Sequence, residues 1–219
     1  MSHYSALIFD FDGVITLSEP IHYEAIIRAI KPFGLSLDYE TYAADYIGLG
    51  DVESYQKLFK AHQKPCDRNL IDCIIANKTK IYEAIAKELQ AVEGVMELVE
   101  QAESLDWQLG ICSAARYDDL YAVLPPLNNS ELIKHFKVIV SGNEMPYGKS
   151  TPDGYLLTAK KLKVDPKACV VIEDSPVGIR SAKKAGMYVF GITTSYSKPL
   201  LKEADCIVDS LLEINLTNL

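Results

Sequence analysis

The second half of the chain alternates between short apolar runs and segments whose apolar residues recur at helical spacing. Each run is continuous and bounded by turn residues, which is typical of a buried strand. Together with the run near the start of the chain, the predicted strands cover residues 6–11, 107–113, 138–141, 168–173, 188–192 and 206–208. Strands that alternate with helices predict an α/β fold, in which helices cover both faces of a mostly parallel sheet.

Residues 18–90 have a different pattern and carry no strand signal. Their apolar residues recur at helical spacing, most clearly in two groups: Ile21, Ala25, Ile26 and Ile30, then Leu70, Ile74, Ile75 and Ile81. Helix breaks are expected near Gly34, Gly48, Gly50 and Pro65. The order of elements therefore predicts a core of residues 1–16 and 92–219, interrupted by an inserted all-α cap of residues 17–91.

Two helix starts are well marked in the second half of the chain. Thr151 is a predicted N-cap, and Pro152 suits the first helical position after it. Ser175 and Pro176 repeat this arrangement, and Gly186 suits the end of the second helix. Both starts follow candidate catalytic residues, at a place where a helix N-terminus favours anions.

Composition and charge indicate which kinds of partner and which cellular compartment are expected. The net charge of −8 makes the chain a poor candidate for binding nucleic acid, and it requires any phosphate site to supply local positive charge. The five cysteines are scattered and odd in number, which favours free thiols in the cytoplasm. No signal peptide and no run long enough to span a membrane is recognisable. We expect a cytoplasmic monomer that acts on a small molecule.

Two pairs of acidic residues follow predicted strands. Asp10 and Asp12 follow the first strand, where residues two apart point to the same side. Glu173 and Asp174 end the strand of residues 168–173. Ligands of open α/β sheets bind beside such strand ends, and clustered carboxylates are ligands that Mg²⁺ prefers. Taken singly, each pair is equally well explained as a turn before Gly13 or as a cap of the following helix.

Three further residues can hold a phosphate group. Ser113 ends a predicted strand, and Ala114 follows it without bulk, so a hydroxyl and a backbone N–H are available there. Lys149 lies just before the helix that starts near Thr151 and would neutralise both carboxylates and phosphate. Alone, Ser113 is more simply explained as a small turn residue and Lys149 as a solvated lysine.

Taken together, these residues resemble the four motifs of the haloacid dehalogenase-like superfamily, in chain order. The motifs are DFDGV at residues 10–14, Ser113, KSTPD at residues 149–153 and EDSPVGI at residues 173–179. The resemblance covers nearly the whole chain, and the helical insert resembles the cap of the β-phosphoglucomutase and phosphoglycolate phosphatase branch. It implies a Rossmann-like, doubly wound core with an inserted helical cap.

The resemblance also implies a role for each motif residue. Asp10 would attack phosphorus and form an aspartyl-phosphate, and Asp12 would protonate the leaving group and then activate water. Mg²⁺ would be held by Asp10, the backbone carbonyl of Asp12 and Asp174, with Glu173 nearby. The transferring phosphoryl oxygens would be held by Ser113 and Lys149. Charge neutralisation and positioning would then supply most of the catalysis.

In the cap, His22 and Lys78 match positions that face the site in relatives, although each is equally an ordinary helix-surface residue. Asp51 departs from the sugar phosphomutases, which carry an arginine there to grip the distal phosphate of a bisphosphate. Leu17 replaces an aspartate usual in the family, which bears on cap closure. An acid at position 51 would repel the distal phosphate and so disfavours a phosphomutase.

A dehalogenase and an inactive scaffold both fit the motifs less well than a phosphatase does. A haloalkanoic acid dehalogenase needs no metal and lacks the second aspartate of the first motif, which is present here as Asp12. An inactive scaffold would have lost a motif residue, and all of them are present. The sequence therefore predicts a Mg²⁺-dependent phosphatase of a small phosphorylated metabolite, such as a sugar phosphate or a short phosphorylated acid.

Overall fold

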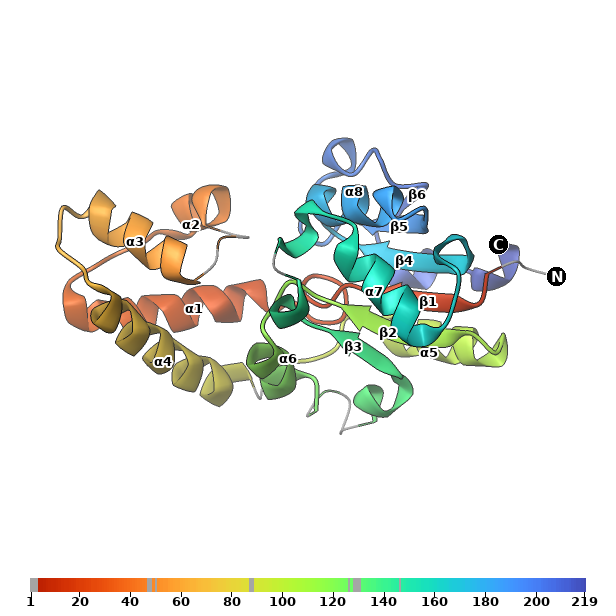
Figure 1. Ribbon diagram of the computed structural model, residues 1–219, viewed down its shortest axis with the longest axis horizontal. Coiled ribbons are helices and arrows are strands. Elements are labelled where there is room, and N and C mark those ends of the chain that lie inside the picture. The colour runs from red at the N-terminus through yellow and green to blue at the C-terminus, as the bar shows by residue number, and fades with distance from the viewer. Residues whose placement is uncertain are drawn as a thin grey trace. The chain divides into compact units, whose positions relative to one another are not determined.

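Six parallel strands form the centre of the larger of two structural units (Figure 1). They are β1 (Ala6–Phe9), β2 (Gln108–Cys112), β3 (Val138–Val140), β4 (Cys169–Glu173), β5 (Tyr188–Ile192) and β6 (Cys206–Val208). Their order in the sheet is β3-β2-β1-β4-β5-β6, and every pairing is parallel. The predicted Rossmann-like fold with a mostly parallel sheet is confirmed.

The computed structural model describes residues 4–46, 49, 51–86, 89–125, 127, 131–145 and 147–219. The larger unit consists of Met1–Leu17 and Leu89–Leu219, and the smaller one of Ser18–Glu88. None of the helices in the described ranges is both long and apolar enough to cross a membrane.

Helices pack against the sheet of the larger unit. They are α5 (Val95–Ser104), α6 (Tyr117–Val123), α7 (Asp153–Leu162) and α8 (Pro176–Lys184). Helix α7 packs on β2 and β3, while α8 packs on β4 and β5. Ile8 and Val171 share one core cluster with residues of α7 and α8, whereas their neighbours Leu7 and Val170 are buried outside that cluster. Burial of successive strand residues means that both faces of the sheet are covered.

The chain reverses direction across the sheet between β1 and β4. From β1 it continues outward through β2 and β3, and then returns to place β4 on the other side of β1. In register, Phe9 lies opposite both Ile111 of β2 and Ile172 of β4. Such a switch point opens a crevice at the carboxyl ends of the strands, where ligands of these folds bind.

The predicted helix starts are confirmed at one place and shifted at the other. Ser175 caps α8, since its hydroxyl accepts a hydrogen bond of 3.1 Å from the backbone N–H of Gly178. Gly186 follows α8 with a φ of +83°, as its predicted place requires. The prediction that Thr151 is the N-cap of α7 was wrong by one residue, since the N-cap is Pro152. The Thr151 hydroxyl contacts the Asp153 carboxylate instead of a backbone N–H.

The described residues of the smaller unit form helices and connecting loops, and no strand. It contains α1 (Glu19–Ile30), α2 (Tyr39–Asp45), α3 (Asp51–Ala61) and α4 (Arg68–Ile85), with α4 packed on α1 and α3. Ile30 and Ile74 lie in its core, as the helical spacing predicted. The predicted breaks at Gly34 and Pro65 are present, whereas those at Gly48 and Gly50 lie outside the described residues.

Candidate active site

Three buried carboxylates and one lysine meet at the carboxyl ends of β1 and β4. Asp10 directly follows β1, Glu173 is the last residue of β4, and Asp174 follows it. One carboxylate oxygen of each lies within 4.8 Å of those of the other two. Lys149, from the 3₁₀ turn Gly148–Ser150, forms ion pairs with Asp10 and, at 2.6 Å, with Glu173. The three carboxylates and the lysine therefore gather at the switch point between β1 and β4.

With all three carboxyl groups ionised, the acidic cluster would carry more negative charge than its lysine balances. Burial raises the pKa of Asp10 well above its usual value, the charge of Glu173 raises it further, and Lys149 lowers it. Burial and Glu173 likewise raise the pKa of Asp174 to about 7. Two carboxyl groups that resist ionisation side by side form a site that favours an added cation.

Glu173 stays ionised because donors surround it. Burial alone would raise the pKa of Glu173, but Lys149 and hydrogen bonds from Ser175 and Tyr155 bring it below the usual value. Burial would also lower the pKa of Lys149, yet Asp10 and Glu173 together raise it well above its ordinary range. Lys149 therefore remains a cation at neutral pH and bridges the ends of the two strands.

This donor set fits Mg²⁺. All three side chains offer hard carboxylate oxygens, they are buried, and their mutual repulsion is relieved by a divalent cation. The side chain of Asp12, which lies on the turn after β1 and is half-buried, is not among the three. The part predicted for Asp12 in metal binding was that of its backbone carbonyl, and it stays a prediction.

The turn after β1 lies directly against the acidic cluster. Gly13 has a φ of +80°, a conformation that favours glycine, and its backbone N–H donates to the Thr16 carbonyl at 2.8 Å. A side chain at this position would overlap the Asp174 carboxylate. Gly178 in α8 is similarly close to Glu173. The two glycines of the motifs thus leave room for the carboxylates.

The turn after β2 lies at the same edge of the sheet. Ser113 is buried, and its hydroxyl accepts a hydrogen bond of 3.0 Å from the backbone N–H of Ala115. Ala114 between them is exposed. Gly142, which follows β3, donates its N–H to the Ala115 carbonyl at 2.7 Å and so holds this turn. Ser113 and Asp10 follow the neighbouring strands β2 and β1, so they lie at the same edge of the sheet. Their contacts with phosphate stay a prediction.

The predicted cap residues lie together within the smaller unit. His22 of α1 stacks on Tyr82 of α4 with 4.3 Å between ring centroids. Lys78 of α4 is buried, and its Nζ lies 3.8 Å from the carboxylate of Asp51. Burial and the charge of Lys78 lower the pKa of His22 to about 3, so this imidazole is neutral at pH 7. The proximity of His22 and Lys78 to substrate stays a prediction.

Sequence reasoning missed several contacts that surround the cluster. Tyr155 of α7 donates its hydroxyl to Glu173 at 2.8 Å. The backbone N–H and the hydroxyl of Ser175 also bind Glu173, at 3.0 and 2.9 Å. Thr194 and Ser195 follow β5, the neighbour of β4, and reach the turn at Gly13 and Asp174. The sequence offered one signal for Thr194 and Ser195: like Asp10 and Ser113, they come just after a strand.

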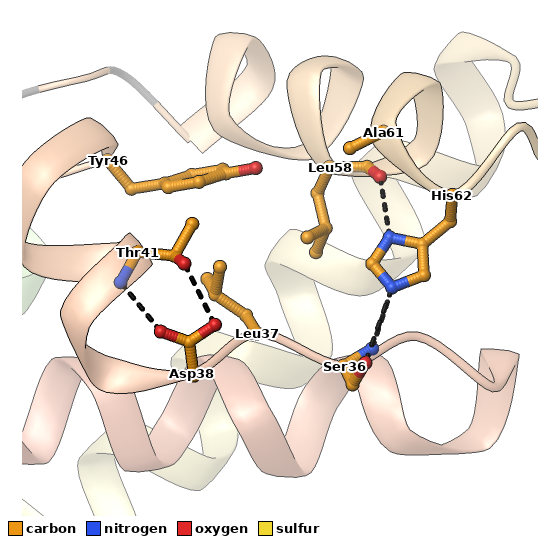
Figure 2. A pocket seen from close by; sticks show the side chains of 8 residues that line it. All are labelled: Ser36, Leu37, Asp38, Thr41, Tyr46, Leu58, Ala61 and His62. Atoms are coloured by element: carbon orange, nitrogen blue, oxygen red, sulfur yellow. Dashed lines mark hydrogen bonds between the residues drawn. The ribbon is translucent and has the colours of Figure 1, made fainter.

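A cavity of about 490 Å³ lies within the smaller unit, and Figure 2 shows the side chains that line it. Two of its polar side chains already have partners: Asp38 accepts hydrogen bonds from the backbone and hydroxyl of Thr41, and His62 contacts Ser36 and the Leu58 carbonyl. These contacts cap α2 and connect the residue after α3 to the loop before α2. The sequence-predicted site residues are not among the eight that line the cavity.

Comparison with known proteins gives consistent results over most of the chain. The model of the haloacid dehalogenase-like hydrolase family matches residues 4–186. A validoxylamine A 7'-phosphate phosphatase of Streptomyces hygroscopicus subsp. limoneus is 28% identical over 96% of each chain. A phosphorylated carbohydrates phosphatase of Thermotoga maritima is 30% identical over 87% of this chain and 86% of that protein. The crystal structure of CbbY from Rhodobacter sphaeroides in complex with phosphate matches with a TM-score of 0.87 and 26% identity over 99% of each chain.

The chain therefore belongs to the haloacid dehalogenase-like hydrolase family. The prediction that it is a phosphoric monoester hydrolase of this family is confirmed, since the family match and the phosphatases among its relatives agree.

Proposed function

We propose that this enzyme is a Mg²⁺-dependent phosphatase that hydrolyses a small phosphorylated metabolite through an aspartyl-phosphate on Asp10. The observation that carries the proposal is the Lys149 ion pair with Asp10, set within the cluster that Asp10 forms with Glu173 and Asp174. A carboxylate that attacks a phosphate dianion faces repulsion, so it needs nearby positive charge. Lys149 supplies part of that charge.

In the first step an oxygen of Asp10 attacks phosphorus, and the bond from phosphorus to the substrate oxygen breaks. Asp12, on the turn that follows, donates a proton to the departing oxygen. Lys149 neutralises charge on the transferring phosphoryl oxygens, and Ser113 and the N–H of Ala114 hold the same oxygens. In the second step Asp12 takes a proton from water, whose oxygen attacks phosphorus. The bond from phosphorus to the Asp10 oxygen breaks, which releases phosphate and regenerates the Asp10 carboxylate.

Mg²⁺, when bound, would supply charge neutralisation for the phosphoryl group. The residues that would hold it are Asp10, Asp174 and the backbone carbonyl of Asp12, with Glu173 close by. Glu173 already accepts hydrogen bonds on both of its oxygens, from Lys149 and Tyr155 on one and from Ser175 on the other. Orienting Lys149 is therefore one of its roles.

For the substrate we propose a sugar phosphate or a short phosphorylated acid. Two of the similar phosphatases are named for phosphorylated carbohydrates or for a 7'-phosphate, which favours a polyhydroxylated leaving group. The smaller unit would act as the cap that selects it, with His22 and Lys78 as its contacts. A panel of phosphorylated sugars, sugar alcohols and short acids, assayed for released phosphate, would identify the substrate class. A full panel without phosphate release would contradict the proposal.

We also propose that the enzyme works in the cytoplasm as a monomer. All five cysteines are free thiols, and two of them, Cys112 and Cys169, are buried in the core. Unpaired buried thiols are common in a reducing compartment, where disulfides do not form.

Asp51 provides the test against a phosphomutase. Its carboxylate partly offsets the positive charge of Lys78, 3.8 Å away, so a distal phosphate would meet less attraction there. With β-glucose 1-phosphate and a trace of glucose 1,6-bisphosphate, we expect free phosphate or no reaction. Formation of glucose 6-phosphate without matching phosphate release would assign a mutase instead.

Substitutions at position 51 test whether the charge of this side chain controls bisphosphate binding. Asp51→Arg should raise the affinity for a bisphosphate, measured as the inhibition constant of glucose 1,6-bisphosphate, and Asp51→Asn should raise it less. Glu53→Arg is the matched control, because Glu53 is exposed in the first turn of the same helix. An equal effect of Glu53→Arg would show that the gain reflects net charge alone.

A further inference from the structure

The loop after β5 contacts both halves of the candidate metal site. The Thr194 hydroxyl donates to the backbone carbonyl of Gly13 at 2.5 Å. The Oγ of Ser195, the next residue, lies beside the Asp174 carboxylate. A Cβ on Gly13 would lie 2.8 Å from the Ser195 Oγ and would overlap Asp174, so these groups converge on the α-carbon of Gly13. Two adjacent hydroxyls therefore reach the turn after β1 and the end of β4.

These contacts join segments that the sheet alone leaves free. The β ladder aligns β1 with β4 only as far as Phe9 and Ile172, and both catalytic segments continue beyond it. Gly13 lies next to Asp12, so the carbonyl that Thr194 holds fixes the course of that turn. Asp174 lies in the acidic cluster beside Asp10 and Glu173, and the Ser195 hydroxyl lies against its carboxylate.

The packing of the loop argues against a purely structural role. Thr194 and Ser195 are exposed, unlike Phe190 and Ile192 of the preceding strand, which are buried. Loss of an exposed hydroxyl usually costs little folding free energy. An effect of these residues on the site would therefore appear separately from an effect on stability.

We propose that Thr194 and Ser195 are positioning residues, which hold the Asp12–Gly13 turn and the Asp174 carboxylate in the arrangement that binds the divalent cation. This inference rests on the proposed function for the identity of the metal site. Neither residue is expected to touch the reacting phosphoryl group, and both act through their neighbours. Groups that orient metal ligands commonly change metal affinity by about 10–100-fold when they are removed.

The test is a titration of Mg²⁺ into the metal-free full-length protein by calorimetry, with the Mg²⁺-induced rise in Tm as a second readout. Thr194→Val and Ser195→Ala should each weaken Mg²⁺ binding about 10-fold or more. Thr194→Ser and Ser195→Thr keep the hydroxyl and should restore most of the affinity. Circular dichroism and the Tm without metal check that each variant is folded.

Two neighbouring residues provide matched controls. Thr193 donates its hydroxyl to Asp209 at 2.8 Å, away from the acidic cluster, and Ser197 makes no side-chain cap contact. Thr193→Val and Ser197→Ala should bind Mg²⁺ as the wild type does. Should Thr194→Val fail to fold, the pair Ser195→Ala and Ser195→Thr still decides the matter.

Wild-type affinity in both hydroxyl-free variants would overturn the proposal, and so would an equal loss in the two controls. Absence of Mg²⁺ binding to the wild-type protein would overturn it as well. Failure of the proposed function has a different signature, namely normal Mg²⁺ binding by the wild type without release of phosphate from any phosphorylated metabolite.

Discussion

Replacing Asp10 with asparagine is expected to lower kcat by about 10⁴-fold or more while the fold persists. The amide is nearly the same size, and its oxygen can still accept the 2.7 Å hydrogen bond from the backbone N–H of Phe11. It is, however, a poor nucleophile, and it removes one of the two carboxylates that pair with Lys149. The measurement is steady-state phosphate release, with circular dichroism to verify the fold.

Asp106→Asn is the matched control for this substitution. Asp106 is exposed and has a φ of +58°, a left-handed conformation that asparagine also tolerates. The control should retain wild-type kcat, since only a carboxylate outside the site is removed. An Asp10→Asn variant that kept a tenth of the wild-type rate would show that another residue attacks phosphorus.

Removal of divalent metal by EDTA is expected to abolish phosphatase activity, and added Mg²⁺ should restore it. The physical reason is the repulsion within the cluster, which raises the pKa of both Asp10 and Asp174 in the absence of a cation. A phosphate dianion would add negative charge to a site that Lys149 alone does not neutralise. EDTA premixed with excess Mg²⁺ is the control for direct effects of the chelator. Undiminished activity after exhaustive chelation would exclude an essential metal.

The strands could be predicted from the sequence because a buried parallel strand is a short apolar run, and such runs are distinctive here. The boundary errors have a physical cause. The first run was predicted to extend to Phe11, but β1 ends at Phe9, because Asp10 and Phe11 already enter the turn that places Gly13 beside Asp174. Apolar character continues through this turn since Phe11 is buried, and pattern alone does not distinguish a strand from a buried turn.

The acidic cluster could also be predicted, since carboxyl ends of parallel strands meet at one edge, Asp10 and Asp174 follow strands, and Glu173 ends one. Tyr155 could not, because an aromatic residue on the buried face of α7 looks like any core residue until its hydroxyl is seen to reach Glu173. Thr194 and Ser195 look like an ordinary polar loop. Their roles depend on β5 lying next to β4, which is a property of the sheet order.

Pairing within the helical unit likewise depends on packing. Lys78, Asp51 and His22 come from three different helices, and helical periodicity gives the buried face of each helix without its neighbour. The ion pair between Lys78 and Asp51 and the stack of His22 on Tyr82 therefore became visible only in the structure. They bear on the Asp51→Arg substitution, because the introduced arginine would lie beside Lys78.

Chemical trapping of the covalent intermediate would show directly whether Asp10 carries the phosphoryl group. The enzyme is mixed with Mg²⁺ and a hydrolysed substrate from the panel, quenched in acid during turnover and reduced with borohydride, which converts an aspartyl-phosphate to homoserine. Peptide mapping by mass spectrometry then locates the change. We predict homoserine at position 10, dependent on both substrate and Mg²⁺ and absent from Asp10→Asn. Modification of a different residue, or turnover with an unmodified Asp10 under conditions that trap a control aspartyl-phosphate, would contradict the proposed mechanism.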